Sequence, residues 1–167
     1  MGDMYRWDFT SNSDAVGTVY GNYQAIISRA NFIIGGYDKC DMSNEMLFTP
    51  EEKANVSNIK GEAFFVRAYS IFMLSQYFCA DYDANTATAA NSGVSYRLDY
   101  APSSSSSTYP GRKTLAETYT QVKNDLDSAA LYITTEGMPS NIRISKDAIT
   151  ALRARVALAM DDYTNAA

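Results

Sequence analysis

The feature that most constrains the fold is segment 61–78, GEAFFVRAYSIFMLSQYF, which is apolar on nearly every side. A helix with one apolar face lies on a surface, whereas a helix that is apolar all round needs neighbours on more than one face. The segment also contains Glu62 and Arg67, and it is too short and too interrupted by charge to span a membrane. We therefore expect a helix that is buried within a stack of other helices.

The charged side chains of this helix need partners, because a buried charge without one is costly. We expect Arg67 to pair with an acid or with backbone carbonyls. The candidate acids are Glu62 and residues of a later helix such as Asp125. Arg155 occupies the matching place in a second helix pair, and we expect it to make an equivalent contact. We expect both arginines to have a structural role.

The first helix pair is predicted over residues 13–78. Its first helix runs from about Ser13 to Ile34 and stops at the glycine pair 35–36. Its second helix opens at TPEE, residues 49–52, where threonine, proline and glutamate form a capping box, and it ends near Phe78. Apolar side chains recur in the first helix at helical spacing: Val16, Tyr20, Tyr23, Ile26, Ile27, Ala30, Ile33 and Ile34.

The second helix pair is predicted over residues 114–160. A second capping box, Thr114 to Glu117, opens its first helix, and its second helix runs from Ser145 to about Met160. The inward residues of its first helix are Leu115, Tyr119, Val122, Leu126, Ala129 and Ile133. Those of its second helix are Ala148, Ile149, Leu152, Val156 and Ala159. The sequence ends as a further helix begins at 162–167, which predicts a piece of a longer protein.

Between the pairs lies segment 79–113, a long irregular loop with a run of five serines and a short extended piece, GVSYRL, at 93–98. The two pairs show a faint internal repeat, in which each second helix carries small residues and one arginine near its middle. Helical hairpins of this kind stack and share a core, as in tetratricopeptide-like arrays. We expect an all-α fold of tetratricopeptide-like stacked helical hairpins.

Composition excludes several functions. The net charge of −5 and the absence of a basic run leave no electrostatic footprint for nucleic acid or anionic lipid. The chain has no histidine, the commonest general base and metal ligand, so we expect a protein that is not an enzyme and needs no cofactor. Cys40 and Cys79 are too few and too far apart for a disulfide framework or a zinc motif.

Five collinear segments together resemble the SusD/RagB family of SusD-like outer-membrane nutrient-binding lipoproteins. They are YGNYQAIISRANFII, NIKGEAFFVRAYSIFMLSQYF, GVSYRLDY, YPGRKTLAETYTQVKNDLDSAALYI and ISKDAITALRARVALAMDDYTNAA. The resemblance covers nearly the whole of 1–167 and implies a partial, N-terminal helical domain. It further implies capture of an oligosaccharide or polysaccharide at the cell surface for a TonB-dependent outer-membrane transporter (SusC-like). A lipid anchor before this segment would tie the protein to the membrane. Cys79 departs from the family pattern, which has glycine there.

Two regions have the chemistry of sugar recognition, in which aromatic rings lie against apolar sugar faces and polar groups bind hydroxyls. The first is the segment before the first helix, where the resemblance places a ligand-binding tryptophan: Tyr5, Arg6, Trp7, Asp8 and Asn12. Trp7 either contacts ligand or packs on the helix. The second is the loop at 80–112, whose rings either contact ligand or pack on the scaffold: Tyr82, Tyr96, Tyr100 and Tyr109, near Asp81, Asn85 and Arg97.

Two other interpretations remain. Oxygen ligands alternate at Asp81, Asp83 and Asn85, as in calcium loops, but the glycine and the closing glutamate of such loops are missing, so we expect no metal site. As an alternative to glycan binding, the helical hairpins would serve as a scaffold whose main role is protein–protein docking.

Overall fold

The structure, a computed structural model, describes residues 10, 13–41, 43, 48–134 and 143–166. Every regular element within these ranges is helical. The elements are α2 (Asp14–Asp38), α3 (Pro50–Phe78), the 3-10 helix η1 (Ser106–Thr108), α4 (Leu115–Tyr132), α5 (Lys146–Ala159) and α6 (Tyr163–Ala166). The expected all-α class is confirmed.

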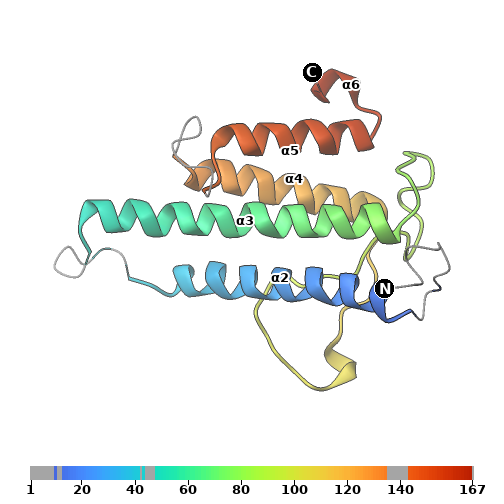
Figure 1. Cartoon of the computed structure of the whole chain (residues 1–167), viewed down its shortest axis with the longest axis horizontal. Helices are drawn as coiled ribbons and strands as arrows, with labels where there is room; N and C mark the ends of the chain where they lie inside the picture. The colour runs from blue at the N-terminus through green and yellow to red at the C-terminus, as the bar shows by residue number, and fades with distance from the viewer. Residues whose placement is uncertain (1–9, 11–12, 42, 44–47, 135–142, 167) are drawn as a thin grey trace.

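The four long helices lie side by side in chain order, and each runs antiparallel to the next (Figure 1). Helix α3 packs against both α2 and α4, while α5 covers α4 and α6 folds back on α5. The structure is therefore a stack of helical hairpins, as the apolar character of segment 61–78 predicted. None of the helices in the described part of the chain has the length and apolarity needed to cross a membrane.

The centre of the stack is the second half of α3, where residues on several sides of the helix are buried. Ile71 and Leu74 are completely buried, and the inward residues of α4 and α5 pack against them. Gly61 lies where the end of α4 comes very close to α3, because a Cβ atom there would lie 2.6 Å from Cγ1 of Ile133. The glycine at position 61 thus lets the C-terminal end of α4 pack close to α3.

Both predicted capping boxes are present. The Thr49 side chain accepts from the backbone N–H of Glu52, and the Glu52 carboxylate accepts in return from the Thr49 N–H at 2.8 Å. Thr114 and Glu117 repeat this arrangement at the start of α4. Ser145 caps α5 by accepting from the Ala148 N–H at 3.4 Å. These polar residues satisfy backbone donors that a helix start leaves unpaired.

The prediction that the first helix stops at the glycine pair 35–36 is wrong, because α2 continues to Asp38. The extra turn brings Tyr37 and Asp38 to Lys60 of α3. The Lys60 ammonium donates to Asp38 Oδ1 at 2.6 Å and lies 4.3 Å from the centre of the Tyr37 ring. These contacts offset the helix-breaking tendency of two glycines. Ile33, predicted to point inward, is instead exposed.

Candidate functional site

A buried polar network lies where α2, α3 and α4 meet, and it begins at Arg67. The guanidinium donates from Nε and Nη2 to the two carboxylate oxygens of Asp125, at 2.8 and 2.7 Å. Arg67 also donates to the side-chain oxygen of Asn31 at 2.8 Å. All three residues are almost completely buried. The prediction that Arg67 pairs with an acid is confirmed, with Asp125 as the acid.

Glu62, the other candidate partner of Arg67, has a different role. Its carboxylate accepts from Arg143 Nε at 2.8 Å and from the backbone N–H of Ile144 at 3.2 Å. Glu62 therefore ties α3 to the segment that leads into α5. The two charges inside the apolar stretch of α3 are thus each satisfied, Arg67 by residues of α2 and α4 and Glu62 by the segment before α5.

The prediction for Arg155 is wrong. Arg155 is exposed, and its guanidinium carbon lies 5.9 Å from the centre of the Phe72 ring. Its neighbour Arg153 instead forms the ion pair with α4, through Asp127. The repeat between the two helix pairs is too approximate to carry the position of a single side chain from one pair to the other.

The buried network also holds part of the long loop. Asn31 donates from its side-chain nitrogen to the carbonyls of Arg97 and Asp99, at 2.9 and 3.2 Å. Gln24 donates to the Ser95 carbonyl at 2.7 Å, and Arg67 donates to the Leu98 carbonyl at 3.3 Å. A segment without regular secondary structure is therefore fixed through four of its backbone carbonyls. We call residues 95–99 the anchored segment.

The part of the loop between residues 93 and 113 is closed at its base by two backbone hydrogen bonds. Gly93 donates to the carbonyl of Lys113 at 2.8 Å, and Lys113 donates to the carbonyl of Val94 at 3.1 Å. The expected extended piece at 93–98 is therefore bound to the scaffold, although no β-strand is formed in the part of the chain that the structure describes. A side chain at Gly93 would collide with the carbonyl and hydroxyl oxygens of Thr114 and Thr118. Glycine is needed here because the loop touches the start of α4.

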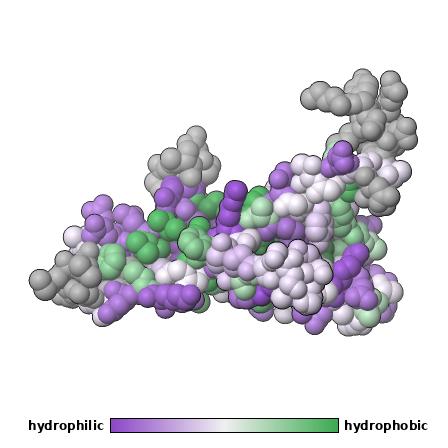
Figure 2. All heavy atoms as spheres, turned by 90° about the horizontal axis from the view of Figure 1, so that it is seen from below, coloured by the Kyte–Doolittle hydropathy of each residue, from purple (hydrophilic) through white to green (hydrophobic). Residues whose placement is uncertain are grey.

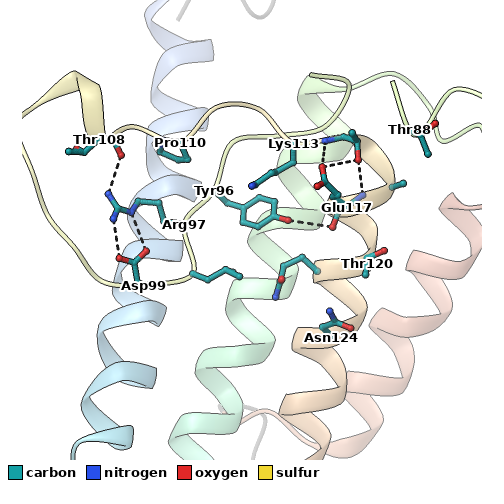
Figure 3. Close-up of a pocket in the computed structure, with 14 residues that line it drawn as sticks. Thr88, Tyr96, Arg97, Asp99, Thr108, Pro110, Lys113, Glu117, Thr120 and Asn124 are labelled. Atoms are coloured by element: carbon teal, nitrogen blue, oxygen red, sulfur yellow. Dashed lines mark hydrogen bonds and ion pairs between the residues drawn. The ribbon is translucent and has the colours of Figure 1, made fainter. Parts of the chain in front are cut away.

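An open groove of about 920 Å³ lies between the long loop and α4 (Figure 3). One wall is the anchored segment from Tyr96 to Asp99, and the opposite side is an outward face of α4 from Glu117 to Asn124. Grooves of this size fit small ligands. The full lining is Thr88, Tyr96, Arg97, Leu98, Asp99, Thr108, Pro110, Lys113, Thr114, Ala116, Glu117, Thr120, Gln121 and Asn124.

Arg97 connects two parts of the loop at the edge of the groove. It donates to the Asp99 carboxylate at 3.3 and 3.0 Å and to the Thr108 carbonyl at 3.2 Å (Figure 3). The hydrogen bond from Arg97 lowers the pKa of the Asp99 carboxyl below its usual range. Arg97 therefore links Asp99 to residue 108 at the edge of the groove.

Tyr96 forms part of the groove wall, but most of its ring is buried. Its hydroxyl donates to the backbone carbonyl of Glu117 at 3.4 Å (Figure 3). Burial, together with the nearby charges of Glu117 and Asp125, raises the pKa of Tyr96 to about 12. Tyr96 therefore stays neutral and fixes the wall against α4, rather than presenting a free ring.

The other predicted site residues divide into two groups. Tyr5, Arg6, Trp7 and Asn12, together with Asp8, lie outside the residues that the structure describes. In the loop, Tyr82 packs edge-on against Tyr119 of α4 with ring centres 5.0 Å apart. Tyr100 and Tyr109 are exposed, and Tyr100 packs edge-on against Phe32 of α2. Of the loop tyrosines, only Tyr96 lines the groove.

Sequence reasoning missed the residues of α4 that face the groove, chiefly Thr120, Gln121 and Asn124. These are common residues on an exposed helix face. Their only sequence signal is that neutral amide and hydroxyl side chains recur at positions where a solvated helix usually carries charge.

The acids of the loop form no evident metal centre. Asp83 uses Oδ1 to accept from the backbone and side-chain nitrogens of Asn85, both at 2.9 Å. No cluster of three metal-ligating residues occurs among the described residues. Cys40 and Cys79 are unpaired thiols, and burial raises the pKa of Cys79.

The fold and the groove define a class: a tetratricopeptide-like helical scaffold that holds an irregular loop against one helix to form an open polar groove. The chain belongs to the SusD-like family, because residues 2–158 match the family described as "Starch-binding associating with outer membrane". No protein with a curated description matches the sequence.

Solved structures of the same superfamily share the fold. A SusD superfamily protein from Bacteroides thetaiotaomicron is 26% identical, with a TM-score of 0.75 over 99% of this chain. A SusD-like carbohydrate binding protein from Bacteroides vulgatus is 18% identical, with a TM-score of 0.66 over 89% of the chain. A SusD-like protein from Bacteroides fragilis is 18% identical, with a TM-score of 0.67 over 98%. The chain spans 34%, 29% and 29% of these proteins, respectively.

Proposed function

We propose that this protein binds an oligosaccharide without cleaving it, as part of a glycan uptake system at the bacterial outer membrane. The observation that carries the proposal is the match to a starch-binding family over residues 2–158. The open groove, of about 920 Å³, is large enough for a small ligand and is built on a rigid helical frame. On this proposal the bound glycan passes to a TonB-dependent, SusC-like transporter, and a lipid anchor holds the complete protein at the cell surface.

The domain assignment is part of the same proposal. Residues 1–167 would form the helical part of a SusD-like protein, because the chain spans 34% of the relative from Bacteroides thetaiotaomicron. The remainder of the complete protein would then contribute further ligand contacts.

Trp7 provides the test of glycan binding, because it is the single tryptophan of the chain. We propose that its ring lies against a sugar face, together with Tyr5 and Arg6. Titration with maltoheptaose, a soluble starch fragment, should then change the tryptophan fluorescence. In affinity electrophoresis through starch, Trp7→Ala should migrate faster than the parent protein. Unchanged fluorescence and equal migration of both proteins in starch and in blank gels would contradict starch binding through Trp7.

Protein docking is a second candidate function, and one surface favours it. Phe32 and Ile33 of α2 and Leu98 and Tyr100 of the loop are exposed, and the rings of Phe32 and Tyr100 pack edge-on. Figure 2 shows the side of the molecule that carries α2, where apolar side chains are exposed among polar ones. Exposed apolar groups that gather on one face are typical of interaction sites. If docking is the main role, Phe32→Ser should abolish co-purification with the transporter, whereas Trp7→Ala should leave it intact.

A further inference from the structure

We propose that the groove between the anchored segment and α4 is a subsite for an uncharged stretch of the glycan. The inference rests on the proposed function and adds to it both a location and a ligand class. The site lies within the described residues and needs none of the N-terminal residues around Trp7. It is therefore testable separately from the aromatic site.

The charges of the groove indicate a neutral ligand. Its lining contains two cations, Arg97 and Lys113, and two acids, Asp99 and Glu117. Both acids already have partners, since Asp99 accepts from Arg97 and Glu117 accepts from the Thr114 backbone and hydroxyl. The lining therefore has no net charge, and the chain as a whole carries −5. An acidic polysaccharide would gain little attraction at this site.

The face of α4 toward the groove offers neutral hydrogen-bonding groups. Thr120 and Asn124 are exposed and lie one helical turn apart, and both line the groove (Figure 3). Within the described part of the chain, neither side chain makes a hydrogen bond. Hydroxyl and amide groups both donate and accept, as sugar hydroxyls do. Residues four apart on a helix present their side chains about 6 Å from one another, so one short saccharide reaches both.

The loop side of the groove supplies apolar contact. Leu98 is 47% exposed at this edge, and the ring of Pro110 is half-buried in the same wall. Sugar rings have apolar C–H faces as well as hydroxyls, so a groove with an apolar wall and a polar amide face matches both sides of a sugar. Apolar lining with a few placed polar groups is typical of small-ligand sites.

The groove is held in shape before a ligand arrives. The carbonyl of Leu98 accepts from Arg67, and the carbonyls of Arg97 and Asp99 accept from Asn31. Because Arg67 and Asn31 are buried, the loop wall is fixed to the core of the stack. A wall that is already ordered loses little conformational entropy on binding, which favours affinity for a small neutral ligand.

The test uses the full chain and the double variant Thr120→Val/Asn124→Leu, which removes the polar groups at nearly constant volume. Lys123→Ala is the control, because Lys123 is exposed on the same helix but lines the smaller cavity beside α5. Isothermal titration calorimetry would compare four neutral probes with one acidic probe. The neutral probes are maltoheptaose, cellohexaose, xylohexaose and mannohexaose, and the acidic probe is trigalacturonic acid. Amide chemical shifts in NMR spectra would locate the contact on α4.

We expect at least one neutral probe to bind, with shifts at the amides of residues 120 and 124 and little dependence on salt. The double variant should weaken this binding roughly tenfold, whereas Lys123→Ala should leave it unchanged. Neutral binding that the double variant does not affect would overturn the subsite and leave the proposed function intact. Salt-sensitive binding of trigalacturonic acid alone would overturn the ligand class. If the parent chain binds none of the glycans, the subsite and the proposed function fail together.

Discussion

Replacement of Arg67 by methionine tests the network that joins the helical stack to the groove. Methionine fills most of the space of the arginine stem but removes the cation. Asp125, which is 1% exposed, would keep one side-chain donor, the Gln121 amide at 2.8 Å. A buried carboxylate that loses its cation typically costs about 3–5 kcal/mol of folding free energy. The Leu98 carbonyl and the Asn31 side chain would also each lose a donor.

For a chain of 167 residues, each kcal/mol lowers the melting temperature by about 2–4 °C, so the expected loss is roughly 6–20 °C. Urea and thermal unfolding followed by circular dichroism would measure it. Arg153→Met is the matched control, because it breaks the exposed ion pair with Asp127. Such pairs contribute less than about 1 kcal/mol.

The double variant Arg67→Met/Asp125→Leu separates the cost of an unpaired carboxylate from the cost of altered packing. It removes both charges, so it should be more stable than Arg67→Met alone. The reasoning is refuted if Arg67→Met loses no more stability than Arg153→Met. It is also refuted if the stability lost by the double variant equals the sum of the losses in Arg67→Met and in Asp125→Leu, because the two side chains would then act independently.

Three further predictions concern other contacts. Gly93→Ala should lower the melting temperature by several degrees, because its Cβ would meet backbone and hydroxyl oxygens at the start of α4; unchanged melting would refute the close approach. Raising the pH from 10 to 12 should destabilise the parent protein more than the variant Tyr96→Phe. The pKa of Tyr96 is about 12 in the folded state and near 10 in the unfolded state, so the unfolded chain loses its proton first. Equal stability-versus-pH profiles of the two proteins would argue against a buried hydroxyl. Lys60→Met should destabilise the protein by about 1–3 kcal/mol, because the ammonium lies 4.3 and 4.4 Å from the centres of the Tyr37 and Tyr132 rings. Urea unfolding would measure the loss, and an unchanged unfolding midpoint would refute the prediction.

The helices could be predicted because their signals are local. The capping boxes at Thr49 and Thr114 each lie within four residues, and the apolar spacing of α4 identifies its buried face. An acidic partner for Arg67 could be predicted, because Asp125 falls among the buried positions of α4. The extension of α2 past its glycine pair could not, because it depends on Lys60, a residue of another helix.

The groove could not be predicted for the same physical reason. Its walls come from residues 96–110 and 113–124, which helix periodicity does not relate to one another. The link between them runs through side chains such as Asn31, whose loop partners lie more than sixty positions away in the chain. The chemistry of the loop tyrosines favours them as ligand-binding residues when only the sequence is considered. The fold buries Tyr96 and leaves neutral side chains of α4 facing the groove.

Two sets of hydrogen bonds across the long loop divide it into a part that is bound to the helical stack and a tip that is not. Backbone hydrogen bonds join residues 93 and 94 to Lys113 at the base, Arg97 donates to the Thr108 carbonyl, and residues 100–107, beyond the anchored segment, are all exposed. Doubling the length of such a tip costs only about 0.6 kcal/mol of closure entropy. The serine run is therefore a natural insertion point, where an epitope or a fluorescent label would be displayed to solvent while the helices beneath fold as before.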